Sequence, residues 1–131
     1  MIGLDTNVLV RILVRDDADQ ADRAKRFFDA NDESPPSFLI NDVVLAELAW
    51  VLESLYGFGT TDISRAVRSL LDNASIAFES SEVVALALAR FESVAVSFAD
   101  CLIAAKNEAA RCAFTATFDR SMRKLPGVKV L

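Results

Sequence analysis

The sequence of 131 residues contains no histidine, and this absence excludes several kinds of chemistry. Neither a Ser-His-Asp nor a Cys-His catalytic group can form, and no histidine can act as a general acid or base. The chain has only two cysteines, Cys101 and Cys112, so a structural zinc site also lacks its usual ligands. Any metal ion must therefore be bound through oxygen, which favours hard cations such as Mg²⁺ or Mn²⁺.

Glycine and proline are also few, with 4 and 3 residues in a sequence that is 53 % hydrophobic. Such a composition excludes intrinsic disorder and is typical of a chain with a substantial core. The length fits one domain, which we expect to span residues 1–131. We expect both cysteines to be free, buried thiols, because they lie in apolar surroundings.

Long apolar runs are missing as well. The longest run, residues 83–89, is far shorter than the roughly 20 residues of a membrane-spanning helix. The first residues lack a basic stretch that leads into an apolar segment, so they do not resemble a signal peptide. We therefore expect a cytoplasmic protein without a membrane partner.

The charges are unbalanced, since 14 basic residues face 19 acidic ones and the formal net charge is −5. This balance disfavours loose, non-specific binding to nucleic acid, which depends on a basic surface. It does not exclude a nuclease, whose acidic metal site contributes to the balance. It would also suit a protein partner that carries basic residues.

Hydrophobic periods of strand and helix type alternate along the chain, which is typical of an α/β fold. We expect a doubly wound, three-layer α/β/α sandwich with a four- to five-stranded parallel sheet and helices on both faces. The pattern predicts strands at 1–5, 37–40, 75–79, 112–117 and 128–131. It predicts helices at 7–14, 21–28, 43–56, 63–71, 81–91, 97–111 and 119–124.

Two acidic residues, Asp5 and Asp119, follow predicted strands directly. Open parallel sheets bind their ligands at the carboxyl ends of the strands, so both positions favour a site. Each residue has a second interpretation, because an aspartate just before a helix also serves as its N-cap.

Two further acids lie in apolar helices. Glu47 is the one charged residue in the segment 43–52, where an unpaired buried charge would cost several kcal/mol. A salt bridge or a narrow exposed stripe would explain it without a functional role. Asp100 follows Ser97 by three residues, which is the spacing of a capping box. An acid in the first helical turn can cap the helix and bind a cation as well.

The strand ends and early helical turns of a doubly wound sheet can converge on one crevice. Two carboxylates about 4 Å apart repel by roughly 4 kcal/mol at an effective dielectric constant of about 20. Four of them together need a divalent cation to hold them. The set Asp5, Glu47, Asp100 and Asp119 therefore predicts a Mg²⁺ site in which Mn²⁺ can substitute.

Four segments of the chain resemble motifs of the PIN-domain family, and within it the VapC toxins of toxin–antitoxin pairs. These segments are 3–9, 43–48, 97–104 and 117–119, the last with the ending 125–128. The resemblance covers essentially the whole chain. The sequence departs from it at Ser97, where many relatives carry another acid, and at Arg111, where many carry glycine.

The resemblance implies a magnesium-dependent endoribonuclease with catalytic and metal-binding residues Asp5, Glu47, Asp100 and Asp119. Asp5 and Asp100 look like the principal metal ligands, and the other two look like supporting ligands. Polar support of the site would come from Thr6, Asn7 and Thr117.

The implied reaction is the hydrolysis of RNA by a metal-activated water, which leaves a 5′-phosphate and a 3′-hydroxyl. The family also implies two protein partners, a VapB-like antitoxin that inhibits the toxin and a second copy in a homodimer. The helix around Trp50 or the phenylalanines at 27 and 28 would supply dimer surface. Basic residues near the acids could contact phosphates, namely Arg11, Arg15, Arg120, Arg123, Lys124 and Lys129.

Two rival functions remain open at this point. An aspartate-based phosphotransfer domain also places an aspartate after its first strand, but such phosphatases need a second acid where this chain has Asn7. A catalytically inert PIN-like scaffold is the other rival, and such domains usually lose some of the four acids.

Overall fold

Strands and helices follow one another in the order that the sequence predicts. The computed structural model describes residues 1–131. Its strands are β1 (Ile2–Gly3), β2 (Phe38–Ile40), β3 (Ile76–Phe78), β4 (Thr115–Thr117) and β5 (Val128–Val130). Its helices are α1 (Thr6–Val14), α2 (Ala18–Asn31), α3 (Asp42–Tyr56), α4 (Thr60–Leu71), α5 (Ser81–Ser93), α6 (Phe98–Ala109) and the 3₁₀ helix η1 (Arg120–Lys124).

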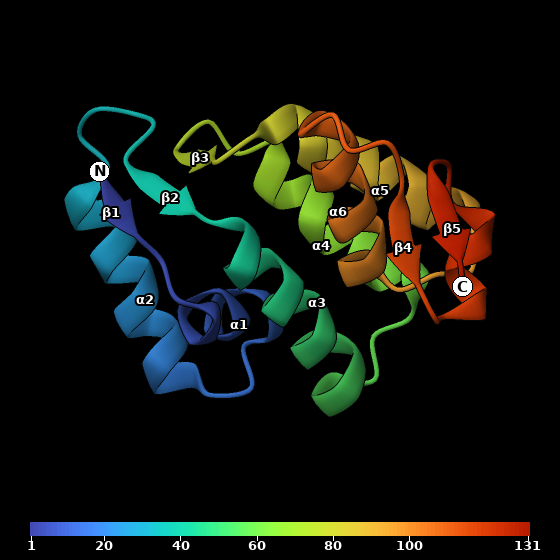
Figure 1. Cartoon of the computed structure of the whole chain (residues 1–131). Helices are drawn as coiled ribbons and strands as arrows, with labels where there is room; N and C mark the ends of the chain where they lie inside the picture. Colours follow the sequence, from blue (N-terminus) through green and yellow to red (C-terminus); the bar gives the residue numbers. More distant parts are fainter.

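All strand pairs are parallel, so the predicted α/β class with parallel strands is confirmed. The expectation of one four- to five-stranded sheet is wrong in its strand count. Strands β1, β2 and β3 form a three-stranded sheet with β2 in the centre, and β4 and β5 form a separate pair. β1 has only two residues, so its outer edge offers few N–H and C=O groups for another strand. Figure 1 shows β1 and β4 on opposite sides of the molecule.

Capping residues fix where the helices begin and end. Oδ1 of Asn41 accepts a hydrogen bond of 2.9 Å from the N–H of Val44, which starts α3. Gly57 ends that helix with a φ of 67°, a left-handed conformation that glycine adopts without strain. Arg111 also has a left-handed φ, of 63°, in the turn after α6. Glycine adopts this conformation with less strain than arginine does.

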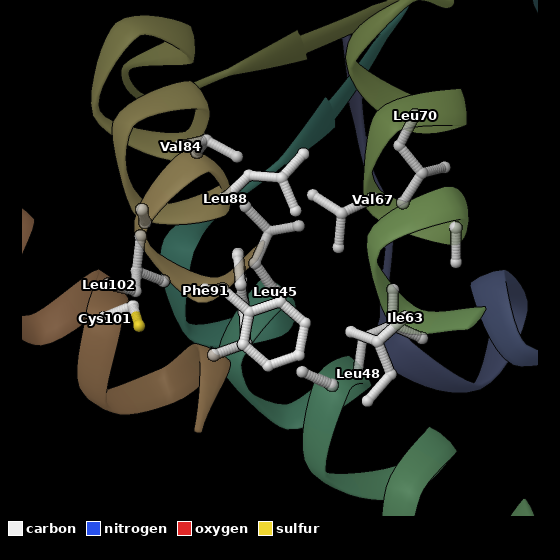
Figure 2. Close-up of a cluster of buried hydrophobic side chains, with 14 of the residues drawn as sticks. Leu45, Leu48, Ile63, Val67, Leu70, Val84, Leu88, Phe91, Cys101 and Leu102 are labelled. Carbon is white, nitrogen blue, oxygen red and sulfur yellow. The ribbon is translucent and has the colours of Figure 1, made fainter. Parts of the chain in front are cut away.

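The main core lies between α3, α4, α5 and α6. Figure 2 shows side chains from these four helices pointing toward one another. Leu45 from α3, Val67 from α4 and Leu88 from α5 are at most 1 % exposed. Each fully buried side chain of this size stabilises the fold by about 1.5–3 kcal/mol relative to an exposed one. Packing between helices, rather than between long strands, therefore holds this part of the fold.

The helix α2 has no fully buried residue and is attached by aromatic packing. The ring of Phe28 lies 4.5 Å from that of the buried Phe38 on β2, measured between centroids. Phe27 packs on the same two rings at 6.0 and 6.1 Å. Phe27 and Phe28 thus attach α2 to β2 near the carboxyl end of the helix.

The two cysteines differ in their surroundings. Cys101 is buried in α6 as expected, but Cys112 is exposed. The expectation for Cys112 is wrong because α6 ends at Ala109 and the chain turns outward at the surface. None of the helices combines the length and the apolar character that crossing a membrane requires.

Candidate functional site

Asp5 lies at the surface between β1 and α1. Its Oδ1 accepts a hydrogen bond of 2.8 Å from the N–H of Thr6, so the carboxylate caps α1. The other oxygen, Oδ2, makes no hydrogen bond within the protein. The hydroxyl of Thr6 is buried and also has no partner. Capping therefore leaves half of the Asp5 carboxylate available to a ligand.

Asp119 follows β4 and caps η1. Its Oδ1 accepts hydrogen bonds from the hydroxyl and the N–H of Ser121, at 2.7 and 2.9 Å. These two bonds hold the pKa of the Asp119 carboxyl below its usual value. The N–H of Asp119 donates to the hydroxyl of Thr117 at 3.0 Å, so Thr117 does contact this acid.

Asp100 is half-buried in the first turn of α6, which Ser97 caps. The Ser97 hydroxyl accepts a hydrogen bond of 3.2 Å from the N–H of Asp100. The carboxylate does not return a bond to the N–H of Ser97, so only half of the expected capping box forms. Burial raises the pKa of the neighbouring Cys101 to about 11, and the Asp100 charge adds to the rise.

Glu47 is exposed on α3, contrary to the burial that its apolar segment suggests. It shares the outer stripe of the helix with Val43 and Trp50, which are 76 % and 61 % exposed. It has no ion pair in the structure. A salt bridge or an exposed stripe would each explain Glu47 without a functional role. The structure shows the exposed stripe.

The four acids are not gathered into one cluster. No group of three acidic, histidine or cysteine side chains lies close enough to hold a metal ion. Asp5 and Asp119 follow strands that point in the same direction but lie on opposite sides of the molecule (Figure 1). Four carboxylates supply the donor atoms that Mg²⁺ prefers, but in this arrangement they do not fit a metal ion.

The structure also reveals a buried carboxylate that sequence reasoning did not single out. Asp42, the first residue of α3, is 6 % exposed and accepts a hydrogen bond at Oδ2 from Lys106 of α6. This bond raises the pKa of Lys106. The Asp42 N–H donates to Glu79, which follows β3, at 2.8 Å. The only sequence signal was an acid just after a predicted strand, which suggests a cap.

The basic residues near the acids have different surroundings. Arg11 donates hydrogen bonds to Asp16 and Tyr56, and the Tyr56 bond raises its pKa. Lys129 lies 5.2 Å above the ring of Phe114, a cation–π contact. Other predicted phosphate contacts are exposed, namely Arg15, Arg120, Arg123 and Lys124.

Comparison with known proteins identifies one relationship. A family model described as PIN domain matches residues 2–128, which is nearly the whole chain. PIN domains are in general nucleases that typically use divalent metal ions, and they often occur in toxin–antitoxin systems. No curated protein and no solved structure matches the chain.

Proposed function

The chain belongs to the PIN domain family, and we propose that it is the ribonuclease toxin of a VapBC-type toxin–antitoxin pair. The observation that carries this proposal is the match over residues 2–128 in a chain that keeps all four acids expected of an active member. Asp5 and Asp119 are exposed and Asp100 is partly so, which leaves these acids accessible to a ligand.

The proposed reaction is the hydrolysis of RNA phosphodiester bonds in the cytoplasm, with Mg²⁺ as the cofactor. Asp5, Glu47, Asp100 and Asp119 are the proposed ligands and catalytic residues. Because these acids are separated in this structure, metal binding requires that they move closer together. The outer edges of β1 and β4 carry no strand.

The proposed protein partners are a VapB-like antitoxin and a second copy of the chain. The outer stripe of α3 offers apolar surface for the homodimer, through Val43 and Trp50. An antitoxin arginine would pair well with the exposed carboxylates of an acidic chain.

A catalytically inert PIN scaffold is the second candidate function. The separation of the four acids is the observation that favours it. An RNA cleavage assay distinguishes the two candidates, because an inert scaffold cleaves no RNA with any metal ion.

RNA cleavage by purified, antitoxin-free protein tests the proposal. Transfer, ribosomal and messenger RNA are incubated with Mg²⁺, with Mn²⁺ and with a chelator. Asp5→Asn keeps the shape of the side chain and removes its charge, and Asp72→Asn makes the same change at an exposed acid outside the proposed site. We expect metal-dependent cleavage by the wild type and by Asp72→Asn, and none by folded Asp5→Asn.

Three results would contradict the proposal. Equal cleavage by both variants would indicate a contaminating nuclease. Fragments that end in a 2′,3′-cyclic phosphate would exclude hydrolysis by water. Absence of cleavage, together with an unfolding temperature that Mg²⁺ and Mn²⁺ leave unchanged, would favour the inert scaffold.

A further inference from the structure

A groove runs between α1 and α2, which lie side by side (Figure 1). Its volume is about 540 Å³, and its lining residues are Asn7, Val8, Arg11, Gln20, Arg23, Ala24 and Phe27. The short turn 15–17 joins the two helices. The lining of this α1–α2 groove includes Asn7, in the first turn after Asp5, and the hydrogen-bonded pair Arg11 and Gln20.

The α1–α2 groove is lined by two arginines, although the whole chain is acidic, and each arginine has an aspartate beside it just outside the groove. Two guanidinium groups line it and no carboxylate does. The other large cavity of this region, of about 320 Å³, has two acidic residues, Asp29 and Asp32, among its lining residues together with two basic ones, Arg15 and Lys25. A guanidinium that keeps a free side in a concave surface can attract a phosphate group.

Arg11 is held in a fixed position in the groove. Its Nε donates to Oε1 of Gln20, and its Nη1 donates to Asp16 at 3.0 Å and to Tyr56 at 3.4 Å. Nη2 makes no hydrogen bond within the protein. A guanidinium fixed on one side and unpartnered on the other is prepared to bind a phosphate oxygen.

Arg23 is held loosely. Its Nη1 lies 3.8 Å from Oδ2 of Asp19, and the two side chains are 70 % and 82 % exposed. Exposed ion pairs of this kind contribute little to stability. Arg23 can therefore exchange this contact for a phosphate at small cost.

Phe27 adds an aromatic surface to the same groove. It is 38 % exposed, while Phe28 and Phe38 fix its ring at centroid distances of 6.0 and 6.1 Å. An aromatic ring held this way can stack on an unpaired base. Two guanidiniums beside one open ring are typical of a surface that binds single-stranded nucleic acid.

We propose that the α1–α2 groove binds a single-stranded segment of the RNA substrate and leads it to Asp5. Arg11 and Arg23 contact its phosphates, and Phe27 stacks on a base. This inference rests on the proposed ribonuclease function. An acidic peptide shares the attraction to the guanidiniums but has no base to stack on Phe27, so the aromatic ring favours RNA.

Binding of a fluorescently labelled, single-stranded RNA oligonucleotide to the full chain tests this inference. Fluorescence anisotropy in a chelator separates binding from cleavage. Arg23→Gln and Phe27→Leu are the test variants, because leucine keeps apolar packing but cannot stack. Phe27→Tyr keeps the ring. Arg26→Gln is the matched control, since Arg26 lies on the same helix but outside the groove.

We expect Phe27→Leu to weaken binding by about 5- to 100-fold and Phe27→Tyr to bind like the wild type. Arg23→Gln should lower the slope of log K against log salt concentration by about 0.7, the effect of one lost phosphate contact on a single strand. Arg26→Gln should change neither quantity. Unfolding curves of all variants verify that they are folded.

The inference would be overturned if the wild type did not bind the oligonucleotide, or if Arg23→Gln, Phe27→Leu and Arg26→Gln all bound it equally well. It would also be overturned if duplex RNA or polyglutamate competed more strongly than single-stranded RNA. The outcome is separable from that of the proposed function. Groove-dependent binding without cleavage in Mg²⁺ supports the groove and contradicts the nuclease. Metal-dependent cleavage that Arg23→Gln and Phe27→Leu leave unchanged supports the nuclease and contradicts the role of the groove.

Discussion

Lys106 on α6 donates a hydrogen bond to Oδ2 of Asp42, a side chain that is only 7 % exposed at the start of α3. The backbone of Asp42 is bonded in turn to Glu79, the residue after β3. Asp42 therefore connects α3 to α6 through its carboxylate, and α3 to the end of β3 through its backbone N–H. Its second oxygen, Oδ1, is buried without a partner, so Lys106 is its only counter-charge in contact.

Lys106→Met should reduce the free energy of unfolding by about 2 kcal/mol. The substitution leaves a buried carboxylate without its partner, which lowers the free energy of unfolding by about 3–5 kcal/mol when both partners are fully buried. Because Lys106 is 46 % exposed, the expected decrease is smaller. Urea unfolding measures the effect, with the exposed Lys124→Met as control. Equal stability of the two variants would show that the pair contributes nothing.

Leu88→Ala should reduce the free energy of unfolding by about 3 kcal/mol, because Leu88 is fully buried where α5 meets α3 and α4. Leu86→Ala, on the same helix at 38 % exposure, should cost less than about 1 kcal/mol. Both values come from chemical denaturation with an unchanged dependence on denaturant. Similar losses for both variants would contradict the packing of α5 in Figure 2.

A thiol reagent at pH 8 should modify Cys112 and leave Cys101 unmodified in the folded protein. Cys112 is exposed, whereas Cys101 is buried and its pKa is raised to about 11, so it stays protonated. Intact mass should show one adduct, and peptide mapping should place it at Cys112. Denaturant should allow a second adduct. Rapid labelling of Cys101 without denaturant would mean that α6 is not packed as described.

Tyr56→Phe should destabilise the protein above about pH 4 and have a smaller effect below it. The Tyr56 hydroxyl donates to Oδ2 of Asp16 at 2.9 Å, and this bond lowers the pKa of Asp16. A lowered pKa in the folded state adds stability above the ordinary value of about 4, and the gain is lost as pH falls below it. Thermal unfolding from pH 3 to 7 measures this. A wild-type advantage that grows toward pH 3 would contradict the assignment.

Local features of the fold were predictable from the sequence because neighbouring residues determine them. Asn41 and Gly57 mark the ends of α3 through side-chain capping and a left-handed φ, and both act over a few residues. The order of strands and helices follows from apolar periodicity in the same way. Strand pairing is different, because it depends on contacts between distant segments, and a strand as short as β1 carries almost no register signal.

The candidate site was predictable in its residue types but not in its surroundings. Counting apolar residues around Glu47 suggests burial, yet Val43 and Trp50 share its exposed stripe because they are four and three positions away. Asp42 looked like an ordinary cap because its partner Lys106 lies 64 positions away. Neither the exposure of an apolar stripe nor a long-range ion pair leaves a local mark in the sequence.

The two parallel sheets differ in how much chain separates their strands. Ten residues, 118–127, join β4 to β5, whereas 34 residues, 4–37, lie between β1 and β2. The entropy of loop closure grows with the logarithm of length, so closing the amino-terminal pair costs about 1 kcal/mol more. The strands of the carboxyl-terminal pair therefore meet more readily, whereas the amino-terminal sheet depends on contacts between more distant segments.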